Sequence, residues 1–242
     1  MNANHYGRGS ALPAFAPLPI LQPGEGVPDD ATYLSAEPAT VLWGRLPCRT
    51  DAPVLTIASG DTIVIDTVSH EGTLPDQGGD PAAFFGSHGV PGDAVLRDAI
   101  EIAAHSRRDP VLDGPHIVTG PIRVEGARPG DLLAITVVRL QPRVPYGVIS
   151  NRHGKGALPG ELPRSGSTVS VFAPVEERDG ALWGTLPVVE GGARTVTFPL
   201  APFLGTMGVA TASDERPHSV PPAAYGGNID VKLLVEGTTL YL

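Results

Sequence analysis

Side chains able to bind a metal ion lie at strand ends and in glycine-rich loops of this 242-residue sequence. Asp66 ends a β-branched run, His70 follows four residues later, His116 lies in a Gly/Pro-rich stretch, and Asp230 follows Gly226-Gly227-Asn228-Ile229. Imidazole nitrogens and carboxylate oxygens suit Zn or Mg-like ions. Because β proteins gather ligands from distant strands, spacing alone leaves open a turn or hydrogen-bonding role for each residue.

A carboxylate at a strand end is the second candidate for chemistry. Glu125 follows Val124 directly and precedes Gly126, and a glycine lets the chain turn sharply. The carboxylate can then project into a cleft, where we predict that it is a metal ligand or a proton shuttle. The alternative is that it caps the turn 126–131.

A second polar cluster runs from Asn151 through His153 to Gly156. Its glycines suggest that the backbone closely approaches a ligand or another chain; a solvated surface loop is the alternative. The sequence lacks the G-x-S-x-G, H-E-x-x-H and G-x-x-x-x-G-K-[ST] patterns. Cys48 has no base nearby in the sequence and is expected to be a small hydrophobic residue.

Composition limits the class of protein that can position these groups. Gly 30 and Pro 26 disfavour long helices, while 41% hydrophobic and 18% charged residues indicate a folded chain. The net charge of −9 argues against a nucleic-acid partner. No apolar run reaches the roughly 18 residues of a membrane span, and no signal peptide is recognised. We therefore expect an acidic, cytoplasmic, β-rich protein.

The positioning elements are expected to be mainly strands. Residues 1–37 are predicted to be an irregular arm and residues 38–242 a β domain. One helix is predicted near 94–106, capped by Asp93. Two long polar loops, 69–91 and 142–163, lie between strands, and the first is expected to border the site. Predicted strands are 40–43, 54–58, 62–68, 122–124, 132–140, 169–172, 181–186, 195–200, 208–210, 230–234 and 238–242.

Four segments, in order, carry a resemblance to a known family. The stretch from His116 to Leu132 resembles the H-x-x-T-G-P-x-x-V-E-G-A-x-P-G-D segment of the acetamidase/formamidase family. Residues 202–210 are similar to its P-F-x-G-x-x-G-V-A segment. Residues 220–222 and 226–230 resemble its V-P-P and G-G-N-x-D elements, and residues 237–242 resemble its G-S-T-L-Y-L strand.

The resemblance implies a metal-dependent hydrolase that cleaves the C–N bond of a small linear amide, releasing ammonia. It implies packed β-barrel or β-sandwich lobes, a homo-oligomer, and a divalent ion, with Zn expected and Ca considered as a second ion. Glu125 would be the catalytic carboxylate. The expected ligands are Asp66, His70, His116 and Asp230, and the expected substrate contacts are Asn151, His153, Gly227 and Asn228.

The sequence departs from the family pattern in three places. Family members continue beyond the T-L-Y-L strand into a G-D-x-H-x-x-Q-G-D-G-E segment, and this sequence ends at Leu242 before it. That segment is expected to hold substrate or metal contacts, and a truncated chain, a separate second chain and a shortened relative are the alternatives considered. Tyr225 stands where relatives often have His, and the loop 69–81 differs from that expected for formamidases. Two other functions are therefore considered: a non-catalytic or structural β subunit, and a hydrolase of a cyclic or N-substituted amide.

Overall fold

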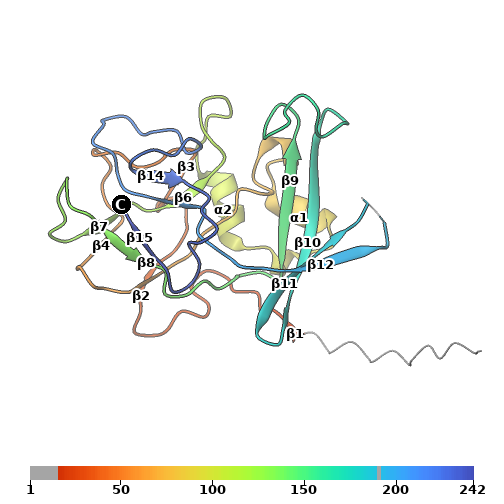
Figure 1. Ribbon diagram of the computed structural model, residues 1–242, viewed down its shortest axis with the longest axis horizontal. Coiled ribbons are helices and arrows are strands. Elements are labelled where there is room, and N and C mark those ends of the chain that lie inside the picture. Colours follow the sequence, from red (N-terminus) through yellow and green to blue (C-terminus); the bar gives the residue numbers. More distant parts are fainter. Residues whose placement is uncertain (1–15, 190–191) are drawn as a thin grey trace, which may run out of the picture.

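The computed structural model describes residues 16–189 and 192–242 and has two lobes joined side by side (Figure 1). One lobe is an antiparallel sheet, and the other is built from pairs of short strands. Helix α2 lies between the lobes in Figure 1, while α1 lies next to the larger sheet. The expectation of a mainly β architecture with packed lobes is confirmed.

The larger sheet has five strands, and its longest member, β10, joins two parts of it. The first half of β10 pairs with β9, and its second half pairs with β11 and β1. Asp179 and Gly180 connect β10 to β11 with φ of 51° and 75°, as a two-residue hairpin turn requires. The strands are β1 (Ala16–Pro17), β9 (Tyr146–Arg152), β10 (Thr168–Arg178), β11 (Ala181–Pro187) and β12 (Thr195–Pro199).

The second lobe contains five two-stranded pairs. The pairs β2–β5 and β4–β7 are parallel, and the pairs β3–β6, β8–β15 and β13–β14 are antiparallel. Parallel neighbours need long connections, so this lobe brings together residues that are far apart in the sequence. The strands are β2 (Thr32–Leu34), β3 (Val41–Trp43), β4 (Leu55–Ile57), β5 (Ile63–Ile65), β6 (Ile117–Thr119), β7 (Ile122–Val124), β8 (Ala134–Thr136), β13 (Thr206–Gly208), β14 (Gly226–Asn228) and β15 (Thr239–Tyr241).

The described chain has two α-helices, not one. Helix α1 (Pro81–Ser87) was missed inside the predicted polar loop; Asp80 caps it by accepting from the Ala83 amide at 3.1 Å. Helix α2 (Arg97–His105) begins later than predicted. Its N-cap is Leu96, not Asp93, because the residues around Asp93 form a short 3-10 turn, Gly92–Ala94.

Two hydrophobic clusters hold the second lobe together. In the first cluster, Ala99 and the fully buried Ile102 of α2 pack against Val68 and Ala36. Trp43 is partly buried and packs against this cluster. The second is centred on three buried side chains, Val137, Met207 and Leu234. The partly buried residues around the first cluster include Val41, Leu96 and Ile117, so its border reaches β6.

Three further sequence expectations need correction. The predicted strand 230–234 consists of turns and irregular chain. The predicted loop 142–163 contains β9, whose alternating pattern went unrecognised. Within the predicted arm, β2 pairs with β5; residues 1–15 of that arm lie outside the described residues.

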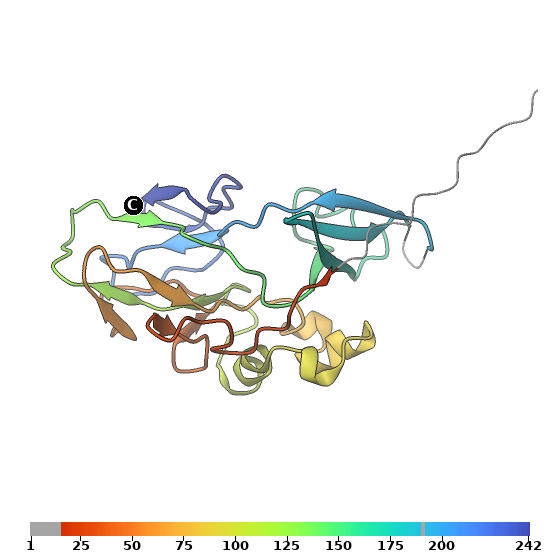
Figure 2. The same ribbon diagram turned by 90° about the horizontal axis from the view of Figure 1, so that it is seen from below.

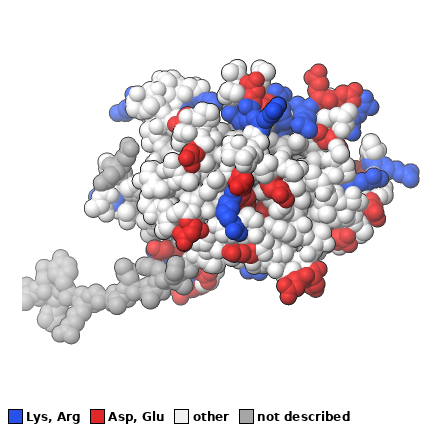
Figure 3. Space-filling model, turned by 180° about the vertical axis from the view of Figure 1, so that it is seen from behind, with Lys and Arg blue, Asp and Glu red and all other residues white. Residues whose placement is uncertain are grey.

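The surface carries mixed charge. On the face in Figure 3, acidic side chains are scattered, and basic side chains are concentrated along the upper part. Figure 2 shows, from below, that both helices lie on the same side of the molecule. Within residues 16–189 and 192–242, no helix combines the length and apolar character needed to cross a bilayer.

Candidate functional site

Two of the four expected ligands, His70 and His116, come together. His70 lies in the loop after β5, and His116 directly precedes β6. Their rings meet edge to face, with centroids 5.6 Å apart and planes at 86°. Burial, followed by the nearby His70, lowers the pKa of His116 below its usual value. His116 is therefore neutral at pH 7, the form needed for a base or a ligand.

A buried serine contacts the His116 ring. Ser219 has no exposed surface, and its Oγ lies 3.0 Å from Nδ1 of His116. The two residues are 103 positions apart in the sequence. The ring thus has a fixed polar partner at Nδ1, which leaves Nε2 for any chemistry.

Glu71 extends this group on the other side. Its carboxylate lies 3.4 Å from Nε2 of His70 and is only 12% exposed. It accepts from Ser150 Oγ at 2.5 Å, from Arg152 at 3.2 Å and from Gln77. Burial opposes ionisation, but the contact with His70, followed by the hydrogen bonds from Ser150, Arg152 and Gln77, outweighs it and lowers the pKa of Glu71 to about 2. Glu71 is therefore a charged carboxylate that holds His70 and anchors its loop.

Strand β9 presents alternate residues to this loop. Ser150 and Arg152 face Glu71, and Arg152 also donates to Asp76 at 2.5 Å. Since side chains alternate along a strand, Asn151 lies on the opposite, exposed side and is directed away from Glu71. His153 follows the end of β9 and is exposed, with its Nδ1 3.2 Å from the Pro163 carbonyl.

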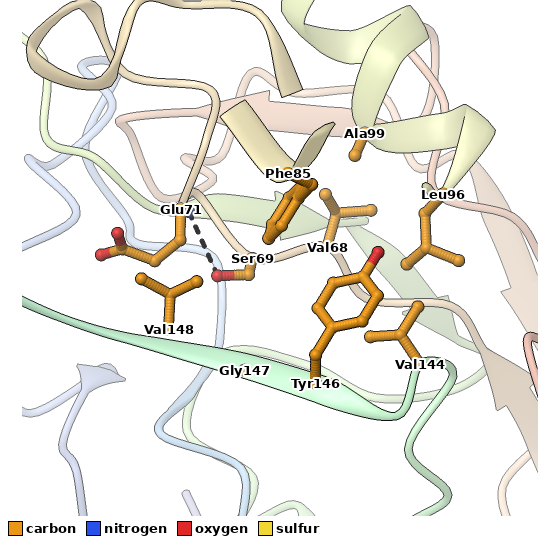
Figure 4. A pocket seen from close by; sticks show the side chains of 10 residues that line it. All are labelled: Val68, Ser69, Glu71, Phe85, Leu96, Ala99, Val144, Tyr146, Gly147 and Val148. Carbon is orange, nitrogen blue, oxygen red and sulfur yellow. Dashed lines mark hydrogen bonds between the residues drawn. The ribbon is translucent and has the colours of Figure 1, made fainter. Parts of the chain in front are cut away.

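A small apolar pocket opens beside Glu71 (Figure 4). Its volume is about 80 Å³. In Figure 4, Glu71 and Leu96 lie at opposite ends, and Phe85 and Tyr146 enclose it from α1 and β9. The Tyr146 hydroxyl is occupied by the Ala94 carbonyl at 2.9 Å, so the wall between the ends is apolar. The lining residues are Val68, Ser69, Glu71, Phe85, Leu96, Ala99, Val144, Tyr146, Gly147 and Val148.

Asp66 takes part in a different network. Its carboxylate accepts from the Tyr33 hydroxyl at 2.5 Å and lies 3.5 Å from a guanidinium nitrogen of Arg143. Arg143 also pairs with the nearly inaccessible Asp98 at 2.5 Å. Burial outweighs this pairing and raises the pKa of Asp98. Asp66 thus helps to neutralise Arg143 and is not directed to the histidine pair.

The G-G-N-I-D segment, residues 226–230, packs next to the residues that hold His116. Gly227 is buried against Leu46, and a Cβ at Gly227 would lie 2.8 Å from a Leu46 methyl. The Asn228 amide donates to the Val220 carbonyl at 3.2 Å, next to Ser219. Both expected substrate contacts have packing roles here. Asp230 is exposed, yet its charge acts on His116 and partly opposes the lowering of the pKa of that ring by burial and His70.

Glu125 makes no contact with the histidine pair among the residues that the structure describes. It directly follows β7, at the start of the turn that leads to β8. Its side chain is exposed, and within the described chain it makes no hydrogen bond or ion pair; its amide donates to the Ile57 carbonyl at 2.8 Å. The structure does not bring Glu125 to the other candidates.

The expected ligand set does not fit a metal ion in this arrangement. Among the residues that the structure describes, no three His, Cys, Asp or Glu side chains form a group able to hold one. His70 and His116 supply two nitrogens, Asp66 is engaged by Arg143, and Asp230 interacts with His116 only through its charge. No chemical step is therefore assigned to a metal here.

Sequence reasoning missed the residues that complete the site, namely Glu71, Ser150, Arg152 and Ser219. The alternation of Val144, Tyr146, Val148, Ser150 and Arg152 is a strand signal that would have identified two of these side chains, Ser150 and Arg152, as lying on one face. The contact between Ser219 and His116 has no local signal, because it depends on the crossing of distant segments.

The fold is similar to that of a solved structure titled gamma lactamase from Delftia acidovorans. The TM-score is 0.54 at 16% sequence identity, and the match covers 85% of this chain and 54% of that one. The family model for the acetamidase/formamidase family matches residues 98–218. This chain therefore belongs to the acetamidase/formamidase family.

Two curated relatives carry the family's activities in their names. An acetamidase of Mycolicibacterium smegmatis is 26% identical over 188 residues, which are 57% of this chain and 46% of that protein. A formamidase of Methylophilus methylotrophus is 24% identical over 180 residues, 57% of this chain and 44% of that protein. The chain thus spans about half the length of these relatives.

Proposed function

We propose that this chain hydrolyses the C–N bond of small linear amides at the His70–His116 pair, giving a carboxylate and ammonia. Membership of the acetamidase/formamidase family supports the reaction type. The observation that supports the place is the half-buried histidine pair, held by Ser219 on one side and Glu71 on the other. Glu71 directly follows His70 in the chain, whereas Ser219 lies 103 positions from His116.

In this proposal His116 is the base. Water attacks the amide carbonyl carbon while Nε2 of His116 takes a proton from the water. The protonated ring then returns a proton to the nitrogen as the C–N bond breaks, so that ammonia leaves and the carboxylic acid remains. The lowered pKa of His116 supports this role, because the ring is unprotonated before the reaction starts. Glu71 keeps His70 in place beside it.

The apolar pocket beside Glu71 would receive the acyl part of the substrate. A volume of about 80 Å³ corresponds to roughly half a dozen non-hydrogen atoms. Formamide, acetamide and propionamide are within that limit, and aryl amides exceed it. The charged carboxylate of Glu71 lines one end of the pocket, which disfavours anionic substrates.

A panel of amides tests the proposal. Ammonia release from formamide, acetamide, propionamide, a five-membered lactam and N-methylacetamide would be measured with the purified protein. We expect turnover of the linear primary amides. Turnover of only the lactam or the N-substituted amide would favour a hydrolase of cyclic or N-substituted amides. No turnover at all would favour a structural subunit.

Metal dependence and assembly remain predictions. Metal analysis of the protein, with and without chelator treatment, tests whether a divalent ion such as Zn or Ca is bound. Light scattering after size exclusion tests the expected dimer or higher homo-oligomer. Neither outcome changes which side chains surround the histidine pair.

A further inference from the structure

The pocket beside Glu71 is lined by three polar side chains, those of Ser69, Glu71 and Tyr146. The Tyr146 hydroxyl donates to the Ala94 carbonyl at 2.9 Å, so its hydrogen is already used. The Glu71 carboxylate can only accept hydrogen bonds, and three neighbouring side chains already donate to it. Ser69 is the remaining side chain of the pocket that could donate a hydrogen bond to a ligand.

The Ser69 hydroxyl accepts one hydrogen bond and keeps its own hydrogen. Its Oγ accepts from the Glu71 amide at 3.2 Å, the contact drawn as a dashed line in Figure 4. Within residues 16–189 and 192–242, the hydroxyl hydrogen of Ser69 has no acceptor. A serine oxygen has one donor and two acceptor sites, so this hydroxyl can donate to a carbonyl while it still accepts from the amide.

The chain on both sides of Ser69 is held in place. Val68 is 7% exposed and belongs to the buried cluster with Ala99 and Ile102 of α2. Two residues after Ser69, the Glu71 carboxylate is anchored to β9 through the Ser150 hydroxyl. A donor that is already fixed loses little conformational freedom when a ligand binds, and this lowers the cost of binding.

The pocket has a polar end and an apolar end. Ser69 is the exposed member of the lining set, whereas the other lining residues are buried or partly buried. In Figure 4, Ser69 lies on the Glu71 side of the pocket, and Leu96 lies at the opposite end. A small molecule that has one hydrogen-bond acceptor and a short alkyl chain matches this arrangement.

We propose that the Ser69 hydroxyl binds the carbonyl oxygen of the substrate, with the acyl chain directed towards Leu96. This inference rests on the proposed function, in which the acyl part occupies the pocket. Ser69 directly precedes His70, and Glu71, at the same end, lies 3.4 Å from Nε2 of His70. A carbonyl bound to Ser69 is therefore held at the end of the pocket nearest to the histidine pair.

The same hydrogen bond acts on the reaction. As water adds to the carbonyl carbon, the electron pair of the C=O double bond moves to the oxygen, which becomes negatively charged. The Ser69 hydroxyl stabilises that charge until the C–N bond breaks and the carbonyl forms again. Ser69 is not the nucleophile, because within the described chain its one partner is the Glu71 amide, a donor that cannot take the hydroxyl proton.

Binding of butanone to the intact protein tests this role without any reaction. Butanone has the shape of propionamide and the same carbonyl acceptor, but it has a methyl group in place of NH2. In protein labelled at the valine methyl groups, butanone should shift the NMR signals of Val68, Val144 and Val148 saturably. Ser69→Ala should weaken this binding by about 3–10-fold, the effect of losing one neutral hydrogen bond.

Three controls separate the hydrogen bond from other effects of the substitution. Ser69→Thr keeps the hydroxyl, and Ser165→Ala removes an exposed hydroxyl between β9 and β10, so both should bind butanone within about twofold of wild type. The alkene that has CH2 in place of the butanone oxygen should bind equally to wild type and Ser69→Ala. Equal binding of butanone by wild type and a folded Ser69→Ala overturns the proposal. Pocket valines of the wild type that do not respond to butanone also overturn it.

The kinetic arm depends on amide hydrolysis. For propionamide, Ser69→Ala should lower kcat/KM by about 10²-fold, as is typical when a donor to the developing negative charge is removed. Unchanged kcat/KM in a folded Ser69→Ala overturns the role of Ser69 in the reaction. A wild-type protein that binds butanone through Ser69 but releases no ammonia refutes the proposed function and supports the carbonyl-binding role of Ser69.

Discussion

Replacing Glu71 with glutamine tests whether a charged carboxylate anchors the site loop. The substitution keeps the shape but places an amide NH2 where Gln77, Ser150 and Arg152 donate. The Glu71 pKa falls from 4.5 to about 2, a shift of about 2.5 units. At about 1.36 kcal/mol per unit, the ionised form contributes up to about 3.4 kcal/mol at pH 7.

The direction of the pKa shift determines how the contribution of Glu71 to stability changes with pH. Because the folded-state pKa lies below the unfolded value, the contribution is complete above about pH 5 and is lost as pH falls towards 2. The difference in unfolding free energy between wild type and Glu71→Gln should therefore shrink by about 1.4 kcal/mol between pH 6 and pH 3.5. A loss of about 3 kcal/mol at neutral pH corresponds to a Tm lowered by about 6–12 °C.

Urea unfolding followed by tryptophan fluorescence at several pH values measures the loss of unfolding free energy in Glu71→Gln and its change with pH. Glu37→Gln, at an exposed glutamate whose carboxylate accepts a hydrogen bond from Ser35 Oγ, is the matched control and should change stability by less than about 0.5 kcal/mol. The reasoning is refuted if Glu71→Gln is as stable as the control, or if its deficit is the same at pH 6 and pH 3.5.

Three further predictions concern the buried network, the pocket and the strand face. Arg143→Met should cost about 3–5 kcal/mol in urea unfolding by leaving Asp98 uncompensated, and less as pH falls, since the raised pKa of Asp98 lets it take up a proton; a constant deficit would contradict this. Val148→Phe, which fills the pocket, should lower kcat/KM for propionamide at least about tenfold more than for formamide. Ile149→Phe, on the exposed face, should not. Equal effects on the two substrates would exclude the pocket as the site that binds the acyl group. Asn151→Ala, His153→Ala and Glu125→Gln should each keep activity within about twofold, because these side chains are exposed and make no contact with the histidine pair among the described residues. A loss of about 10²-fold in Glu125→Gln would restore the sequence-based hypothesis.

The sequence was informative where a pattern is local. The β-branched runs at Ile122–Val124 and Thr195–Pro199 predicted strands close to those observed, since alternation and β-branching reflect the chain's own geometry. The helical period of α2 was equally visible. Helix α1 was missed because its seven residues are too few to show a period, although Asp80-Pro81 is a good helix start.

The site was only partly predictable for a different reason. His70 and His116 were recognised as chemical groups, and both lie in the site. Their partners were not, because a one-residue error in the face of β9 exchanges Ser150 and Arg152 for Asn151 and His153. The Ser219 contact depends on backbone crossings at Gly44, which no local pattern in the sequence records.

The most direct measurement of the central proposal is ammonia release from acetamide by wild type, His116→Ala and His105→Ala. His105 is an exposed histidine on α2 and serves as the matched control. With His116 as the base, we predict turnover by wild type and His105→Ala and a loss of about 10²–10⁴-fold in a folded His116→Ala. Full activity of His116→Ala would contradict the placement of the reaction at the His70–His116 pair.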